Sequence, residues 1–255
     1  MTISAADLSY SLTRDRAEVE AAWERLLEFK HHSLHQSASW NDAWTKAYGT
    51  ELCFLVGRYG DDIKLLLPLE LTSVFGIKTL AMPGASFSNL TSILAGAEIS
   101  PSANAVDVKK LRAAIVQAVR PFSDALIITG LALDWRGTRS VFKGLETTVN
   151  QNKSFQLPLL ETFEETIRQI NAKRRRKKYR ISREIAAELG GYNYKVASTE
   201  DEKRRILEVF FAQKNKRLDE HDLPSPFTNV KTKASIHALL DDTCGRGSDR
   251  MLELH

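Results

Sequence analysis

The hydrophobic positions of the first fifty residues recur with the period of a helix. Between residues 16 and 31, apolar side chains lie three and four positions apart, which predicts a helix with Asp15 as its N-terminal cap. A shorter helical stretch follows at 36–44, where two tryptophans share one face, and Gly49 is placed to end it. Two helices are therefore expected before the first long strand.

The next hundred residues alternate between strand-like and helical patterns. Residues 52–58 and 63–71 are apolar, rich in β-forming side chains and separated by a turn cluster, so they predict a β-hairpin. Another strand is predicted at 77–82, closed by a Pro-Gly pair. An amphipathic helix at 106–119 and an apolar run at 125–131, which suits a buried strand, complete this part.

The second part of the chain is predominantly helical. Its expected elements are a long helix at 161–189 that ends at two glycines, a short strand at 192–196, helices at 200–218 and 231–240, and the start of a strand at 250–255. Ser198 or Thr199 caps the helix at 200–218. We therefore divide the chain into two domains, 1–150 and 151–255. Because a two-stranded sheet is only marginally stable alone, we expect the second domain to be incomplete.

The composition is that of an ordinary soluble protein with a sizeable core. The 255 residues suit one or two domains, and 43% of them are hydrophobic and 27% charged. These values exclude a disordered, collagenous or disulfide-stapled chain. The net charge of +4 is uneven, because residues 1–150 hold 15 basic and 16 acidic side chains, whereas residues 151–255 hold 21 and 16. The basic character therefore belongs to the second part.

The positions of the cysteines and histidines bear on the cellular compartment and on metal binding. Cys53 and Cys244 lie far apart and form no Cys-x-x-Cys motif, which favours a reducing compartment and argues against a cysteine metal site. His31 and His35 have the spacing of metal ligands, but no glutamate completes the motif, so no metal is expected. No apolar stretch suits a signal peptide or a bilayer span. The sequence therefore predicts a cytoplasmic protein without a membrane span.

A run of basic residues at 173–180 is the strongest local feature of the sequence. It lies within the helix expected at 161–189, and a count of 100° per residue places Arg174 on the apolar stripe of that helix. The cations can extend their charged ends from the edge of the core into solvent. They can also form an inward-facing site for a phosphate or carboxylate, with Arg174 and Lys178 as contacts.

The helix expected at 200–218 places a second pair of cations beside aromatic rings. Phe210 and Phe211 share one of its faces, and Lys214 lies at the centre of that face by the same count. Such a lysine either belongs to a structural ion pair or lines a polar cleft together with Arg217. The sequence identifies no general base. The candidate anion or substrate contacts are therefore Arg174, Lys178, Lys214 and Arg217.

Several short motifs follow one another in a characteristic order along the whole chain. They are Gln36-Ser37-x-x-Trp40-x-x-Ala43-Trp44, Phe54-Leu55-Val56-x-Arg58, Leu66-Leu67-Pro68-Leu69, Gln156-Leu157-Pro158, the basic run at 173–180, Phe210-Phe211-x-Gln213-Lys214-x-x-Arg217-Leu218 and Pro226-Phe227. In this order and spacing, the chain resembles the CelD/BcsL-like acetyltransferases, a group with a BioF2-like acetyltransferase domain in the GNAT superfamily.

The resemblance implies an α/β fold of two tandem GNAT-like (acyl-CoA N-acyltransferase) units, each a mixed, mostly antiparallel sheet flanked by helices. It implies acyl transfer from acetyl-CoA to a hydroxyl or amine of a polysaccharide or envelope precursor, in cellulose or exopolysaccharide synthesis. Family members hold the CoA pyrophosphate at a glycine-containing turn before a helix, and this sequence lacks that turn. We therefore expect the second unit to be C-terminally truncated and the chain to be inactive alone. Self-association or a partner chain would complete the unit.

The competing prediction is a non-catalytic binding module. In that case the basic helix at 173–180 binds an anionic polymer or nucleic acid. Nucleic acid is the less favoured partner, because only Tyr179 is available for stacking and no binding motif accompanies the run. The two functions differ in their measurable signature, since binding through several cations weakens steeply with salt, whereas an acetyltransferase binds acetyl-CoA saturably.

Overall fold

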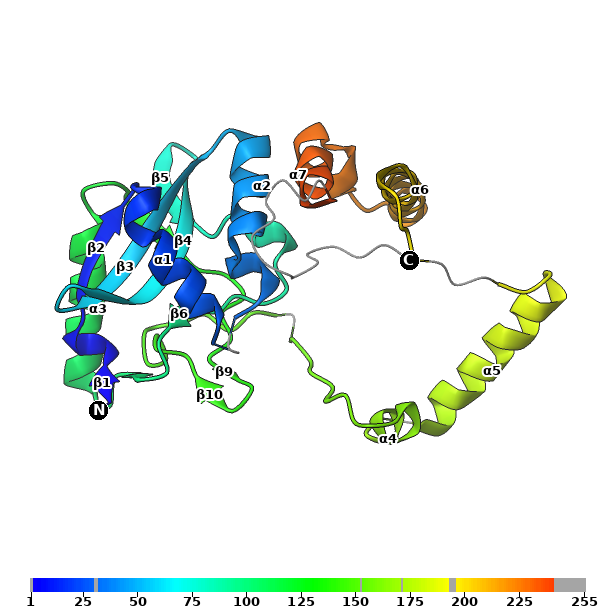
Figure 1. The fold of residues 1–255 in the computed structure, drawn as a ribbon, viewed down its shortest axis with the longest axis horizontal. Coiled ribbons are helices and arrows are strands. Elements are labelled where there is room, and N and C mark those ends of the chain that lie inside the picture. The colour runs from blue at the N-terminus through cyan, green and yellow to red at the C-terminus, as the bar shows by residue number, and fades with distance from the viewer. Residues whose placement is uncertain (1, 30–31, 152, 171, 193–195, 241–255) are drawn as a thin grey trace.

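The first part of the chain folds around a central sheet, and the second part consists of helices (Figure 1). This computed structural model describes residues 2–29, 32–151, 153–170, 172–192 and 196–240. The predicted strand at 250–255 lies outside the described residues, as does most of the strand predicted at 192–196.

The sheet is mixed and mostly antiparallel, as the family resemblance implies. Its strands run in the order β2-β3-β4-β5-β8, with β6 paired to β4. Only β5 and β8 are parallel neighbours. The strands are β2 (Ser9–Thr13), β3 (Glu51–Tyr59), β4 (Asp62–Val74), β5 (Ile77–Ala81), β6 (Leu94–Ala95) and β8 (Ala125–Ile127). Two further pairs lie outside this sheet: β1 (Ile3–Ser4) with β7 (Ile99–Ser100), and β9 (Asp134–Trp135) with β10 (Thr138–Arg139).

Both faces of the sheet are covered, which explains the uninterrupted apolar runs of its central strands. Successive side chains of β4 alternate between two cores, because Leu65 and Leu67 lie on the face covered by α3 (Ala105–Val119). Leu66 lies on the opposite face, which is covered by α1 (Arg16–Leu27). The predicted hairpin of β3 and β4 is thereby confirmed and buried on both sides.

Close packing within the first core requires a glycine in β3. A Cβ atom on Gly57 would lie 3.0 Å from the Leu8 side chain, 3.1 Å from that of Leu65 and 3.2 Å from the Tyr10 ring. These distances are shorter than ordinary van der Waals contact, so a larger residue would displace its neighbours. The register of β3 against β4 shifts directly after Gly57.

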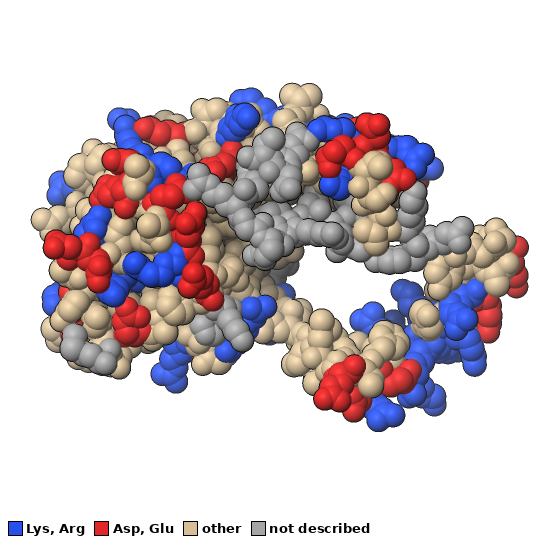
Figure 2. All heavy atoms as spheres, in the orientation of Figure 1, with Lys and Arg blue, Asp and Glu red and all other residues tan. Residues whose placement is uncertain are grey.

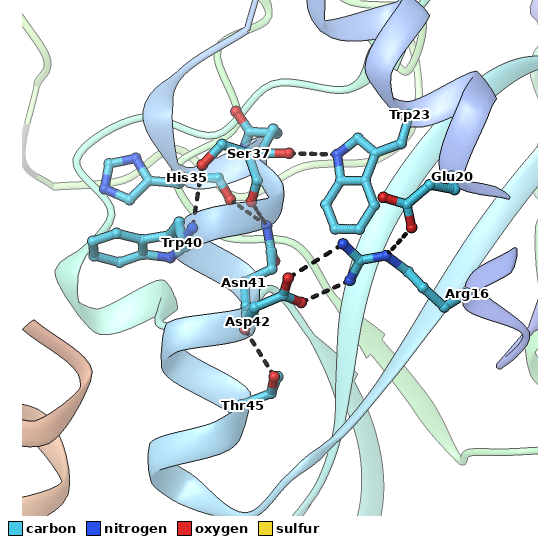
Figure 3. A network of polar contacts seen from close by, with 10 residues as sticks. Arg16, Glu20, Trp23, His35, Ser37, Trp40, Asn41, Asp42 and Thr45 are labelled. Atoms are coloured by element: carbon cyan, nitrogen blue, oxygen red, sulfur yellow. Dashed lines mark hydrogen bonds and ion pairs between the residues drawn. The ribbon is translucent and has the colours of Figure 1, made fainter. Parts of the chain in front are cut away.

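A polar network fixes α2 (Ala38–Tyr48) against α1 (Figure 3). The Arg16 guanidinium donates to both carboxylate oxygens of Asp42 at 2.7 and 3.2 Å, and to Glu20 at 2.7 Å. The Trp23 indole donates to the backbone carbonyl of Gln36, in the 3₁₀ turn η2 (Leu34–Gln36), at 2.7 Å. The predicted cap Asp15 and the predicted terminator Gly49, with a φ of 68°, are confirmed.

Two predicted elements are shorter than the sequence suggests. The helix predicted at 16–31 ends at Leu27, because the Glu28 N–H bonds to the Arg25 carbonyl and tightens the last turn. The buried strand predicted at 125–131 is reduced to β8, whose Ile127 is 45% exposed. β8 is the last strand of the described sheet, so only one of its edges is paired and the burial prediction is wrong.

The long helix predicted at 161–189 is divided into α4 (Phe163–Arg168) and α5 (Ala172–Glu188). α4 ends because the N–H groups of Gln169 and Ile170 bond to carbonyls three residues earlier. The count of 100° per residue therefore cannot run from α4 into α5. Most of the stripe expected to face a core is also solvent-exposed, with Phe163 at 64% and Ile185 at 51%, whereas Ile167 is buried.

The remaining helices pack against the sheet body through α2. α6 (Glu200–Asp219) begins at the predicted cap Thr199, whose hydroxyl forms a capping box with Glu202. The 3₁₀ turn η4 (Pro226–Thr228) leads into α7 (Val230–Leu240), which lies beside α2 in Figure 1. A small core joins α6, η4 and α7 through Leu207, Phe211, Phe227 and Leu240. α4 and α5 lie apart from the sheet body (Figure 1).

Candidate functional site

An aromatic row on α2 forms the junction between the sheet body and the C-terminal helices. Trp40 stacks on Trp44 with ring centroids 6.5 Å apart, and Trp44 stacks on Tyr48 at 4.2 Å. Phe87, in the 3₁₀ turn η3 (Ala85–Phe87), lies 5.6 Å from Trp44 and 6.0 Å from Phe227. Side chains that are distant in sequence therefore meet in one continuous row.

Glu70 is a buried carboxylate next to this row. It accepts a hydrogen bond from Trp44 Nε1 at 3.1 Å and another from the Thr50 hydroxyl at 2.8 Å. Burial raises the pKa of Glu70, and the hydrogen bonds from Thr50, the Gly84 backbone and Trp44 oppose this rise. Both carboxylate oxygens are engaged within the fold, so Glu70 anchors α2 to the sheet.

Polar contacts hold α7 on the end of α2. The hydroxyls of Tyr48, on α2, and Thr232, on α7, share a hydrogen bond of 2.7 Å. Lys231 Nζ donates to the Tyr48 carbonyl at 3.1 Å, and its charge lies 5.8 Å from the centroid of the Tyr48 ring. The C-terminal helices are thus attached to the sheet body by specific contacts as well as by apolar packing.

A histidine–carboxylate pair links α6 and α7. His237 Nε2 lies 2.8 Å from Glu208 Oε1, and Lys233 Nζ lies 3.9 Å from the other oxygen of Glu208. The ring of His237 also meets that of Phe211 edge to face at 5.8 Å. His237 Nδ1 is buried and has no hydrogen-bond partner. When Nε2 donates to Glu208, Nδ1 carries the lone pair, and the surrounding packing separates it from solvent.

The amino-acid sequence alone does not predict this pair. Glu208 and His237 are 29 positions apart and belong to different helices, so no spacing connects them. A helical count places each residue on its own helix face, but it does not predict which faces of two helices meet. Tertiary packing alone therefore identifies the pair.

Two of the predicted contacts, Arg174 and Lys178, lie together on α5. With Ile170 and Arg175 they line a hollow of about 260 Å³. Both cations are exposed rather than directed into a core, and Figure 2 shows Lys and Arg side chains gathered along this helix. The guanidinium and ammonium groups around one hollow suit a phosphate or carboxylate.

The other two predicted contacts, Lys214 and Arg217, lie on α6. Lys214 is half-buried next to the face that carries Phe211, whereas Arg217 is exposed. Among the described residues, no acidic side chain forms an ion pair with Lys214, so the structural ion pair considered from sequence is not found there. α5 and α6 are separate in Figure 1, so the structure does not bring the two pairs of cations together.

Three further kinds of functional feature were sought among the described residues: a reactive thiol, a metal-binding group and a helix that could cross a bilayer. Burial raises the pKa of the Cys53 thiol to about 12, so this cysteine stays protonated and is a poor nucleophile. The described His, Cys, Asp and Glu side chains form no group of three or more that could hold a metal ion. Within the described ranges, no helix combines the length and the apolar character that a bilayer crossing requires.

Comparison with protein families gives a match in the second part of the chain. A model described as an acetyltransferase (GNAT) domain matches residues 173–255, about a third of the sequence. The match begins at the first residue of the basic run and contains α6, α7 and the Glu208–His237 pair. No curated protein and no solved structure matches the chain.

The family match supports the GNAT superfamily, acyltransferase function and acetyl-CoA as co-substrate. The α/β architecture, with its mixed sheet between helices, is consistent with an acyl-CoA N-acyltransferase-like fold. The predicted fold class is therefore confirmed. All four predicted contacts lie within the matched residues, whereas the central sheet lies outside them.

Proposed function

We propose that the chain is a GNAT-type acetyltransferase whose acetyl-CoA site lies within residues 173–255. The single observation that carries this proposal is the family match over those residues. In such a reaction a hydroxyl or amine attacks the thioester carbonyl, the carbon–sulfur bond breaks, and CoA leaves as the thiol. The nucleophile's proton must pass to a base, and the carbonyl oxygen must be stabilised as negative charge develops.

The four cations predicted from sequence are the proposed anion contacts. Arg174 and Lys178 border the hollow on α5, and Lys214 and Arg217 lie on α6. The phosphates of acetyl-CoA are the anions that this reaction introduces, and guanidinium and ammonium groups bind phosphate strongly. The hollow fits a phosphate by charge, which supports Arg174 and Lys178 as contacts.

The Glu208–His237 pair is proposed to hold α6 against α7 rather than to act as the base, because His237 Nδ1 is buried. A buried ring nitrogen cannot receive a proton from an acceptor substrate, so none of the described residues is proposed as the base. The replacements His237→Gln and Glu208→Gln are expected to loosen the packing of α6 on α7, which hydrogen exchange measures. Loss of thioester turnover with an unchanged fold and unchanged acetyl-CoA binding would contradict this structural role.

The finer assignments rest on the resemblance of the sequence motifs. We propose a CelD/BcsL-like enzyme whose acceptor is a hydroxyl or amine of a polysaccharide or envelope precursor, with domains at 1–150 and 151–255. The buried free thiol of Cys53 supports a cytoplasmic location, because reduced cysteines persist there.

A non-catalytic module that binds an anionic polymer through α5 is the second candidate. The solvent exposure of the cations between Lys173 and Arg180 favours it. Such binding is electrostatic and weakens steeply as salt rises. Acetyl-CoA binding to a defined site is saturable and less sensitive to salt.

Calorimetric titration with acetyl-CoA separates these candidates. We expect saturable binding near one equivalent, with affinity reduced about tenfold or more by Arg174→Met combined with Lys214→Met. The matched control, Lys109→Met combined with Arg112→Met on α3, removes the same charge far from the site and should leave binding unchanged. A folded sample that binds no acetyl-CoA refutes the acetyltransferase proposal and supports the alternative expected from sequence, that the chain is inactive alone because it lacks the CoA-pyrophosphate turn. Unchanged affinity in the Arg174 and Lys214 variant refutes only the assigned contacts.

A further inference from the structure

The described residues of the segment 155–189 include α4 and α5 and are called the arm below. The arm combines a dense positive charge with exposed apolar side chains. It lies apart from the sheet body in Figure 1. We propose that the arm binds the surface of an anionic lipid membrane. This inference goes beyond the acetyl transfer proposed above and does not depend on it, because vesicle binding and acetyl-CoA binding are measured separately.

The charge of α5 is strongly one-sided. Its seventeen residues include eight Lys or Arg and two Glu. Arg176 lies 3.7 Å from Glu164 of α4, and Arg180 lies 3.6 Å from Glu184. Across the described part of the chain, no acidic side chain forms an ion pair with Lys173, Lys177 or Lys178. Several full charges therefore remain available for an anionic surface (Figure 2).

The apolar side chains of the arm are as exposed as its cations. Phe155 is 89% exposed and Leu159 is 86% exposed, and both precede α4. On α5, Ile181 and Ile185 lie four positions apart on one face and remain 40% and 51% exposed. The ring of Phe163 lies 6.3 Å from that of Tyr179, so α4 and α5 contact each other.

A membrane surface satisfies both properties at once. Lipid phosphates attract the cations, while the boundary between headgroups and acyl chains accepts leucine, isoleucine and phenylalanine side chains. Nucleic acid provides the phosphates but has no continuous apolar layer, because it takes up apolar side chains by stacking or by insertion at single base steps. Long Lys and Arg side chains can also extend toward headgroups while their stems remain in apolar surroundings.

Vesicle flotation tests this proposal on the full chain. We expect binding to phosphatidylcholine vesicles that contain about a third phosphatidylserine, and none to pure phosphatidylcholine, at ~0.1 M salt. Replacing Lys173, Lys177 and Lys178 by Gln should weaken binding about a hundredfold, since each cation near the surface contributes roughly a fivefold factor. Replacing Phe155 and Leu159 by Ser should weaken binding while leaving all charges in place.

The matched control replaces Lys109, Arg112 and Arg120 by Gln, which removes three exposed cations from the region of α3. This variant should bind vesicles like the unmodified protein, and the circular dichroism of every variant should show an intact fold. Four outcomes overturn the proposal, and the first three are measured with vesicles and DNA. They are absence of binding to anionic vesicles, equal binding to neutral vesicles, and binding of duplex DNA that the Phe155 and Leu159 variant leaves unchanged. A stable dimer in solution that does not bind vesicles would also overturn it, because the arm would then contact a second copy.

Discussion

The sheet body and the arm use similar amino acids in opposite ways. In β4, adjacent leucines enter two different cores, and Leu65, Leu66 and Leu67 are completely buried. In the arm, Leu159 and Ile185 have no core to enter. An apolar residue stabilises a fold only when another element covers it, so composition alone does not distinguish the two regions. The C-terminal helices lie between these extremes, because α7 packs on α2.

Removal of a core ring gives the largest expected difference between the two regions. Trp23→Ala should lower the free energy of unfolding by about 3–5 kcal/mol, because the ring is buried against Phe54 and its indole bonds to Gln36. Ile185→Ala on α5 should change it by less than about 0.5 kcal/mol. Urea unfolding followed by circular dichroism measures both. Similar losses in the two variants would contradict the contrast between the regions.

Phe211→Ala tests whether the C-terminal helices form a local unit of stability. Phe211 is completely buried, between Phe227 and His237. The replacement should destabilise α6 and α7 locally by roughly 3 kcal/mol. Hydrogen exchange should therefore accelerate in α6 and α7 and remain unchanged in β3 and β4. Equal acceleration in the sheet would show that the two parts unfold together.

Glu70→Gln tests the anchor of α2 through its pH dependence. Burial raises the pKa of the Glu70 carboxyl in the native state above its value in the unfolded state, which is near 4.5. The native state therefore keeps the carboxyl protonated to a higher pH than the unfolded state does. The unmodified protein should therefore lose stability relative to Glu70→Gln as pH rises from 4.5 through the native pKa. Urea unfolding of both proteins between pH 4.5 and 7.5 measures this difference. A stability difference that is independent of pH, or that changes in the opposite direction, would contradict a raised pKa of Glu70 in the native state.

Tyr48→Phe has the smallest expected effect. It removes the 2.7 Å hydrogen bond to Thr232 and leaves the ring stacked on Trp44. The loss should be about 1 kcal/mol, and it should loosen α7 more than the sheet. Limited proteolysis should show faster cleavage around α7. Tyr59→Phe, which alters an exposed tyrosine at the end of β3, is the matched control and should have no effect.

Local patterns were sufficient to predict four of the six strands of the described central sheet, whereas β2 and β6 were not predicted. The caps Asp15, Gly49 and Thr199 follow from residue chemistry within one turn, and the hairpin of β3 and β4 follows from two apolar runs around a turn. The break between α4 and α5 was missed because the apolar period continues across it. The sequence showed that β8 is apolar, but not that it lies at the edge of the sheet.

The candidate site was less predictable than the fold. The basic run and the family resemblance could be recognised from consecutive residues, and the match over 173–255 supports the GNAT assignment. The placement of Lys178 and Lys214 on separate helices depends on how those helices are arranged in space. The pairing of Glu208 with His237 likewise depends on packing between α6 and α7. Neither relation leaves a signature in local spacing.

Hydrogen exchange with and without acetyl-CoA tests the central claim most directly, because it locates binding along the chain. The account predicts that saturating acetyl-CoA slows exchange within residues 173–255, including α6, and leaves the buried strands β3 and β4 unchanged. A folded sample in which acetyl-CoA protects none of the residues 173–255, or protects only the sheet body, would contradict it.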